Sequence, residues 1–556
     1  MKNASNSTAA GQTAAADRRE QGRIAAAAGV LASLTLASRI SGLARDVVVG
    51  AVFGASAGAD AFFVAFRIPN LFRRVVAEGA ASIAFIPVFT NRLVKEGRAS
   101  ALRASAAVGA AASVILLFIS ALGMLFADEI VSVFAPGFAA DPAKRALTVE
   151  LTRLTFPYLL LVGMAAWAMG TLHTFRRFAA PAAGPILLNL SMIAAVLGPA
   201  TRFERPLHVL CLGVLAGGLL QIAVQLPSLA AVGLRFKMLF ASFDRAVSRV
   251  GRLLVPALFG GAVYQVNILV ATLFASLLPS GSVSWLWYAD RLFEFPLGIV
   301  AVAVGTAVLP SLSSQAGGGR LGAMADSLGY SLRLVWSLCI PATLGLWLLA
   351  PLLVSVLFER GSFGAVDSQM TAWALRAYVC GLLAVASVRV LVAPFYALEK
   401  PRLPVQAALV ALVVNALADL ALMGPTDPGA PWWGAAAVAA AAELVAVADL
   451  RHAGLALGTA IAALANALVL LFFLRSLLPQ FRLAACASSV GRHTLAAIAM
   501  AAGIMAWQAW ATERGLGDLL QLAVAAGGGF IAYIGVALAL GSSELRGLIS
   551  SVRRRN

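Results

Sequence analysis

Long apolar windows alternate with short polar or Pro/Gly-containing breaks along almost the whole chain. A helix crosses a bilayer core with about 20 apolar residues, so the pattern predicts about 14 membrane-spanning helices. The predicted spans cover residues 25–52, 60–90, 104–127, 152–173, 183–200, 208–233, 253–278, 283–312, 327–350, 370–397, 403–423, 455–474, 493–511 and 518–540. We therefore expect an all-α polytopic membrane protein.

Two segments depart from this simple pattern. Residues 60–90 are too many for one straight crossing, and Pro69 and Pro87 predict a bent or broken helix there. Residues 425–454 separate two spans, and their alanine run is too short and too weakly apolar to cross a bilayer. The tryptophan pair that begins at Trp432 is typical of a membrane interface, so we expect a short interfacial helix on the outer leaflet.

The composition supports a membrane protein. Of the 556 residues, 61% are hydrophobic and only 12% are charged, whereas soluble domains carry about 25% charged residues. The net charge of +17 would suggest a nucleic-acid partner in a soluble protein. In this chain the positive charge comes from an excess of Lys and Arg in alternate loops, such as 92–103 and 235–252, as the positive-inside rule describes for cytoplasmic loops of membrane proteins. No nucleic acid is expected, and both termini are predicted in the cytoplasm.

Motifs for covalent chemistry are not found. The sequence contains no P-loop, no Ser/His/Asp set and no His/Glu metal motif. The four cysteines are scattered and indicate neither a disulfide framework nor a zinc site. We therefore expect a transporter rather than an enzyme.

The first cluster of charges inside a span contains Arg39, Arg45 and Asp46. A charge within a span costs roughly 2.5–3.5 kcal/mol on insertion scales and usually faces the bundle interior. At about 100° per residue, Arg39 and Asp46 share a helix face, and a bend at Ser41 and Gly42 would bring Arg45 to the same side. The arginines then bind an anion while Asp46 orients one of them. Alternatively, an Arg–Asp pair reaches the interface from a helix end.

The second cluster lies in the long segment at 60–90 and contains Asp60, Arg67, Arg73, Arg74 and Glu78. Arg67, Arg74 and Glu78 share one face if the helix continues through Pro69. An amphipathic cytoplasmic connection is the alternative. Because Arg67 lies inside the apolar stretch AFFVAFRIPNLF, a functional role is favoured for it.

The third cluster contains Asp290, Arg291 and Glu294, in which one cation lies within helical reach of two carboxylates. A self-neutralised packing network is the alternative interpretation. Over all three clusters the arginines outnumber the acids. Guanidinium groups bind phosphate oxygens bidentately and stay charged, so a cavity lined in this way suits a pyrophosphate.

Asn415 and Asp419 lie four residues apart on one face of an otherwise apolar span. With Asn267 or Thr459 they could coordinate a cation through oxygen atoms. A hydrogen bond between helices is the favoured alternative, because Asn and Asp commonly join helices in membranes.

Several stretches resemble one family of membrane transporters. Residues 38–89, SRISGLARDVVVGAVFGASAGADAFFVAFRIPNLFRRVVAEGAASIAFIPVF, and residues 281–313, GSVSWLWYADRLFEFPLGIVAVAVGTAVLPSLS, closely resemble signatures of the MurJ/MviN family. Shorter likenesses are FAPGFA at 134–139, LTFPYLLL at 154–161 and HAGLALG at 452–458. The resemblance runs from about residue 25 to residue 545.

The resemblance implies the fold of the multidrug/oligosaccharidyl-lipid/polysaccharide exporter superfamily. Two six-helix lobes, 25–235 and 236–475, would form a central cavity, and two helices within 476–545 would form a groove for a lipid tail. Residues 1–24 would be a disordered cytoplasmic tail and 546–556 a basic cytoplasmic tail. The substrate would be lipid II, flipped outward across the bacterial inner membrane.

The resemblance also assigns residues. The family's functional cations fall on Arg39, Arg45, Arg73 and Arg291. Other positions important in the family match Asp46, Asp60, Arg74 and Glu78, and Arg67 replaces a frequent lysine. Asn415 and Asp419 match part of a sodium site found in some members. No other cofactor is expected; sodium or the membrane potential would drive transport.

The expected partners are lipid II and membrane lipids, and contacts with the cell-wall synthesis or division machinery are possible for such a protein. We expect a monomeric transporter. Three alternatives remain open from the sequence: a flippase for another polyprenyl-pyrophosphate saccharide, a cation-coupled multidrug exporter, and a non-transporting scaffold for cell-wall enzymes.

Overall fold

The computed structural model describes residues 29–31, 33–73, 85–234, 244–427, 429–432 and 434–553. Within these ranges the regular secondary structure is helical. The first helix is described over residues 33–53 and continues through Ser41 and Gly42. The predicted disordered tail at 1–24 lies outside the described residues.

Nine helical spans in the described part of the chain are long and apolar enough to cross a membrane. They are α4 (Arg98–Leu125), α6 with α7 (Pro142–Thr155 and Tyr158–Thr174), α8 (Ala179–Leu197), α9 with α10 (Pro206–Ala223 and Leu226–Ala231), α13 (Leu321–Phe358), α17 (Arg402–Leu422), α19 (Arg451–Leu477), α20 (Ala487–Glu513) and α21 (Asp518–Ala539). A tenth is bent by 42° between α14 (Ala365–Val379) and α15 with α16 (Leu382–Leu391 and Ala393–Ala397).

These ten spans coincide with ten of the predicted ones, and the all-α membrane fold is confirmed. The total of about 14 stays a prediction, because each of the other four predicted spans contains residues whose backbone or side chains lie outside the description. Those four overlap the first helix, α2 (Ala57–Arg73), α11 (Arg245–Ser276) and α12 (Ser282–Gly317).

The predicted break in segment 60–90 is only partly visible. Helix α2 continues through Pro69 to Arg73, and α3 (Ile86–Glu96) begins with Pro87 in its first turn. Proline is tolerated in the first turn because the amide there has no partner within the helix. Residues 74–84, between α2 and α3, lie outside the description.

The chain packs as two compact units. Unit 1 comprises Met1–Val49, Ala65–Asp128 and Val149–Gly261. Its core joins α3, α4, α7 and the start of α11 around Phe89, Trp167 and Leu172. The Trp167 indole also donates a hydrogen bond of 2.8 Å to the Ser105 carbonyl of α4, which satisfies the polar end of this buried ring.

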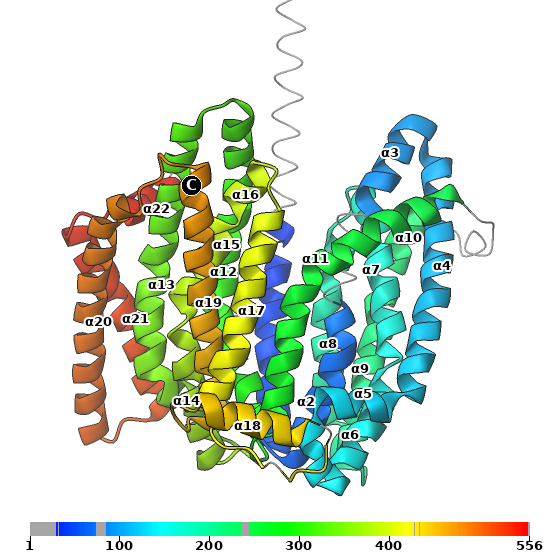
Figure 1. Ribbon diagram of the computed structural model, residues 1–556, viewed down its shortest axis with the longest axis horizontal. Coiled ribbons are helices and arrows are strands. Elements are labelled where there is room, and N and C mark those ends of the chain that lie inside the picture. Colours follow the sequence, from blue (N-terminus) through cyan, green and yellow to red (C-terminus); the bar gives the residue numbers. More distant parts are fainter. Residues whose placement is uncertain are drawn as a thin grey trace, which may run out of the picture. The chain divides into compact units, whose positions relative to one another are not determined.

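Unit 2 comprises Gly50–Val64, Glu129–Thr148 and Ala262–Asn556. Helices α20 and α21 pack against each other and against α13 (Figure 1). Their shared core includes Met500, Ile504 and Tyr533, together with Ile340 and Leu349 of α13. The predicted basic tail at 546–556 includes the end of a further helix, α22 (Ser543–Arg553).

The insertion at 425–454 contains a short helix, α18 (Ala435–Val445). It runs across the end of α17 rather than along it (Figure 1). Leu444 is 86% exposed and Val447 is 80% exposed, so the segment presents apolar side chains on its surface. The predicted helix is present, and its location on the outer leaflet stays a prediction.

Candidate functional site

Arg45 and Asp46 form a buried ion pair within unit 1. Their side chains are 9% and 1% exposed, and Nη2 of Arg45 lies 2.7 Å from Oδ1 of Asp46. Nε donates to the same oxygen at 3.0 Å, while Nη1 donates to Oδ1 of Asn189 on α8 at 3.1 Å. Asn189 in turn donates to the Ser38 carbonyl and to Ser41 Oγ. This places an arginine, held by a neutralising carboxylate, in the interior of an apolar bundle.

Asn189 was not among the residues singled out from the sequence. It lies 144 positions from Arg45, and a single Asn in an apolar span gives no signal of its partner. Arg39 is half-buried one and a half turns earlier in the same helix, and Arg67 is half-buried in α2. Arg73 ends α2, and its side chain lies outside the description, as do Arg74 and Glu78.

Asp60 is the centre of a buried polar cluster within unit 2. Its Oδ2 lies 2.8 Å from Nζ of Lys144 and accepts the Gly281 amide at 2.7 Å. Its Oδ1 accepts both the amide and the hydroxyl of Ser284, at 2.9 and 2.7 Å. The Asp60 carboxylate, from α2, thus caps the first turn of α12. The unpaired amides of that first turn favour a negative charge.

Lys144, on α6, was also missed by sequence reasoning because it falls in a segment predicted to be a loop. Its side chain is 4% exposed, and its ammonium lies 4.1 Å from the centre of the Phe138 ring. A buried ammonium requires a carboxylate and further donors or acceptors around it. Asp60 supplies the carboxylate, and Ser280 Oγ accepts a hydrogen bond of 3.2 Å.

Arg291 is more accessible than Arg45. Its guanidinium lies 4.6 Å from the centre of the Trp287 ring, one turn earlier on α12, and Nη1 donates to Glu294 at 3.3 Å. The Arg291 and Glu294 side chains are 23% and 30% exposed, and Asp290 is half-buried beside them. The cation–π contact holds the guanidinium over the Trp287 ring, and a guanidinium group can bind a planar or tetrahedral oxyanion through two parallel hydrogen bonds.

The predicted pair Asn415 and Asp419 is fully buried on α17. Nδ2 of Asn415 donates to Oδ2 of Asp419 at 2.6 Å. Within the described residues, Oδ1 of each side chain has no hydrogen-bond partner. Gly458 of α19 makes room for this carboxylate, since a Cβ at that position would lie 2.1 Å from Oδ1 of Asp419. Two buried oxygen atoms, one of them a carboxylate oxygen, fit a small hard cation.

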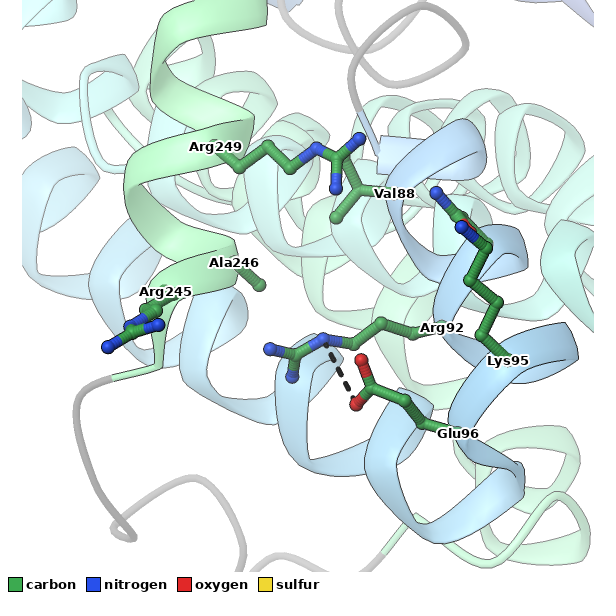
Figure 2. Close-up of a pocket in the computed structure, with 8 residues that line it drawn as sticks. Val88, Arg92, Lys95, Glu96, Arg245, Ala246 and Arg249 are labelled. Carbon is green, nitrogen blue, oxygen red and sulfur yellow. Dashed lines mark ion pairs between the residues drawn. The ribbon is translucent and has the colours of Figure 1, made fainter.

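A separate cationic pocket lies between α3 and α11 at one end of unit 1 (Figure 2). Its volume is about 400 Å³, and it is lined by Val88, Asn91, Arg92, Lys95, Glu96, Arg245, Ala246 and Arg249. Arg92 extends from α3 and Arg249 from α11, across the space between the two helices (Figure 2). The sequence had indicated only a basic loop at this place.

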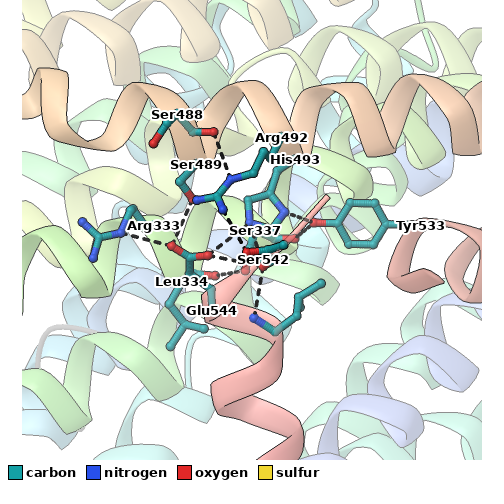
Figure 3. Close-up of polar contacts among 12 residues, drawn as sticks. Arg333, Leu334, Ser337, Ser488, Ser489, Arg492, His493, Tyr533, Ser542 and Glu544 are labelled. Carbon is teal, nitrogen blue, oxygen red and sulfur yellow. Dashed lines mark hydrogen bonds and ion pairs between the residues drawn. The ribbon is translucent and has the colours of Figure 1, made fainter. Parts of the chain in front are cut away.

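Glu544 anchors the C-terminal helix α22 to unit 2 (Figure 3). Its side chain is 1% exposed and accepts hydrogen bonds from Arg333 of α13 and Ser489 of α20, both at 3.1 Å. His493 lies 3.7 Å from Glu544 and contacts the Tyr533 hydroxyl at 2.7 Å. Burial acts to raise the pKa of Glu544, but hydrogen bonds from its own amide and from Ser489 lower it to about 2.

We expect Glu544→Gln to loosen α22 without unfolding the bundle. Removing the carboxylate charge weakens the bond to Arg333, a loss of about 2 kcal/mol for a charge-assisted hydrogen bond. The folded-state pKa of Glu544 lies below its ordinary value of 4.5. The carboxylate of the wild type therefore contributes its full stabilisation of the folded state above pH 4.5, and this stabilisation disappears as the pH falls towards 2. Amide exchange over α22 should accelerate in the variant, whereas exchange over α4 should not change.

The exposed Glu513 at the end of α20 provides the matched control. Glu513→Gln removes the same charge and should leave exchange over α22 unchanged. If amide exchange over α22 accelerated equally in Glu544→Gln and Glu513→Gln, the anchoring role of Glu544 would be contradicted.

The long apolar helices, together with the arginine–carboxylate pairs of Arg45 and Arg291, define the class of this protein: a polytopic membrane transporter. The profile of the family described as Lipid II flippase MurJ matches residues 49–524. The chain is 37% identical over 397 residues to a probable lipid II flippase MurJ of Vibrio cholerae, covering 69% of the chain and 75% of that relative. The chain belongs to the Lipid II flippase MurJ family.

Two further comparisons cover nearly the whole chain. A probable lipid II flippase MurJ of Bdellovibrio bacteriovorus is 33% identical over 542 residues, covering 97% of the chain and 98% of the relative. A solved structure, "Lipid II flippase MurJ, inward closed conformation", superposes with a TM-score of 0.73 at 24% identity, covering 93% of the chain and 99% of that structure. The family resemblance and the all-α membrane fold class expected from the sequence are confirmed, while the count of 14 helices and the lobe boundaries stay predictions.

Proposed function

We propose that this protein moves lipid II, the polyprenyl-pyrophosphate-linked cell-wall precursor, from the inner to the outer leaflet of the bacterial inner membrane. Membership of the MurJ family supports this substrate. The observation that carries the proposal is the placing of Arg45 and Arg291 in apolar helices, each beside a carboxylate. Such pairs keep a cation in the membrane until a doubly charged phosphate group replaces the carboxylate.

The proposed cycle is alternating access. Arg39, Arg45 and Arg291 bind the pyrophosphate in the inward-facing state, and the transporter then exposes it to the outside. The prenyl tail remains in lipid along α20 and α21, whose surfaces carry exposed apolar side chains such as Ile498 and Ile531. Both termini lie in the cytoplasm, as the basic loops favour. A monomer suffices for this cycle, and contacts with cell-wall enzymes are compatible with it.

The test is a depletion–complementation experiment. Cells depleted of their own lipid II flippase express this chain, and growth and outer-leaflet lipid II are measured. Restoration of both supports the proposal. If the protein inserts well in a host with a compatible precursor but restores neither growth nor outer-leaflet lipid II, the favoured substrate becomes another polyprenyl-pyrophosphate saccharide. A multidrug exporter would instead tolerate Arg39→Ala but lose activity when a single acid within the membrane is removed.

A sodium ion is the proposed coupling ion. Asn415 and Asp419 would hold it, and the ion would supply the positive charge that the fully buried carboxylate otherwise lacks within the described residues. We expect sodium to raise the melting temperature of the purified wild type relative to choline, by mass action on the folded state. Asp419→Asn should remove this sodium-dependent rise.

Asp326 is exposed on α13 and serves as the control, because Asp326→Asn should keep the sodium-dependent rise. An identical melting temperature of the wild type in sodium and choline would refute the sodium site while leaving the flippase proposal intact.

A further inference from the structure

The cationic pocket between α3 and α11 is distinct from the arginine–carboxylate pairs within the spans (Figure 2). Its base is apolar, since Val88 and Ala246 are 4% and 3% exposed and both belong to the core of unit 1. Its walls carry the long side chains of Arg92 and Lys95 on one helix and Arg249 on the other. The pocket therefore presents long cationic side chains above a buried apolar surface.

The charges in and beside this pocket are unbalanced. Arg92 lies 2.5 Å from Asp244 and 3.7 Å from Glu96, so one arginine engages both nearby carboxylates. Burial acts to raise the pKa of Asp244, but hydrogen bonds from Arg92 and the Ala246 amide lower it, which keeps the carboxylate ionised at neutral pH. In the part of the chain that the structure describes, Lys95, Arg245 and Arg249 have no ion pair. Three positive charges thus remain available.

The lengths of the helices place this pocket at the edge of the membrane. Helix α4 begins at Arg98, separated from the end of α3 by Gly97 alone, and has 28 residues. At 1.5 Å per residue it extends about 42 Å, which exceeds the bilayer core of about 30 Å. Its polar end carries Arg98 and the exposed Arg103, which belong in the headgroup layer. Arg98 donates to the Val232 and Ala231 carbonyls, which fixes this end of unit 1.

We propose that this pocket binds a phosphate group carried by a membrane lipid. Guanidinium and ammonium groups on two helices can reach one phosphate from opposite sides, and guanidinium groups do so bidentately. Clusters of Lys and Arg beside a span attract anionic headgroups strongly at close range. Two lipids offer the same chemistry: a bulk anionic phospholipid and a polyprenyl pyrophosphate. The site does not depend on which lipid the protein transports.

Binding of inorganic pyrophosphate to the purified full-length protein in phosphatidylcholine nanodiscs tests the proposal by calorimetry. We expect Lys95→Gln/Arg249→Gln to weaken binding by about tenfold, because two of the free cations are lost. Arg92 is left intact, since it holds Asp244 and Glu96. The matched control Arg320→Gln/Arg402→Gln removes two exposed arginines of unit 2 and should bind as the wild type does.

The same variants are compared in an Arg291→Ala protein, so that binding by that arginine cannot account for the loss. Two competition arms then identify the lipid. Phosphatidylglycerol in the nanodisc should reduce pyrophosphate binding to the wild type more than to Lys95→Gln/Arg249→Gln if bulk phospholipid occupies the pocket. If undecaprenyl pyrophosphate alone competes in this way, the pocket binds the lipid-linked pyrophosphate. Unchanged binding in the double variant, or competition by neither lipid, would overturn the proposal whether or not the protein flips lipid II.

Discussion

An Arg291→Ala protein is expected to insert and accumulate normally but to leave flippase-depleted cells without growth or surface-exposed lipid II. The side chain is 23% exposed and its guanidinium lies over the Trp287 ring, so its removal leaves no large buried cavity. It does remove a charged donor to phosphate, for which hydrogen bonds contribute about 1.5–3 kcal/mol each. Two such bonds correspond to a fall in transport of roughly two orders of magnitude or more.

Arg376 offers a matched control for this substitution. Its guanidinium lies 5.0 Å from the centre of the Trp347 ring, so it is also an arginine stacked on tryptophan in unit 2. Arg376→Ala should preserve transport. Arg291→Lys should fall between wild type and alanine, because lysine keeps the charge but loses bidentate binding. Full growth of the Arg291→Ala strain would show that the phosphate-binding role is wrong.

Asp60→Ala is expected to reduce stability by about 3–5 kcal/mol, the usual effect of removing one partner from a buried ion pair. Lys144 would keep a buried ammonium without its carboxylate, and the first turn of α12 would lose its acceptor. Lys144→Met should have a smaller effect, because Asp60 retains the Gly281 amide and both donors of Ser284. The stability is measured by thermal unfolding in detergent.

The double variant makes the test sharper. Asp60→Ala/Lys144→Met should recover part of the loss caused by Asp60→Ala alone, because no unpaired ammonium remains. Asp326→Ala, at an exposed position, controls for the loss of a carboxylate. The losses of stability caused by Asp60→Ala and by Lys144→Met could instead simply add in the double variant. The two side chains would then act independently, which would refute the proposed pairing of Asp60 with Lys144.

Local patterns predicted much of this fold. Apolar runs located ten spans correctly, because bilayer thickness imposes a length that can be read without knowing any partner. The sequence also placed Arg45 and Arg291 beside carboxylates, since those pairs lie within one turn of a helix. Contacts between residues far apart in the chain could not be predicted from such local patterns. Asn189 and Lys144 are joined to their partners by packing between distant helices, which a single sequence does not encode locally.

Helix boundaries were less predictable than helix positions. Helix α2 continues through Pro69 and ends at Arg73, so a break predicted for segment 60–90 does not fall at this proline. The cationic pocket likewise appeared only as a basic loop. Its shape depends on α3 and α11 meeting over one apolar core, although they are about 150 residues apart in the chain.

Five helices pass from one compact unit into the other without an intervening loop. The crossings fall within residues 33–53 and within α2, α5 (Ala127–Phe134), α6 and α11. A loop hinge absorbs rotation in a few backbone angles, whereas a continuous helix resists it along its whole hydrogen-bonded length. Any displacement of one unit against the other must therefore bend these helices elastically. In the proposed transport cycle these helices would therefore bend against a restoring force rather than turn as a free hinge.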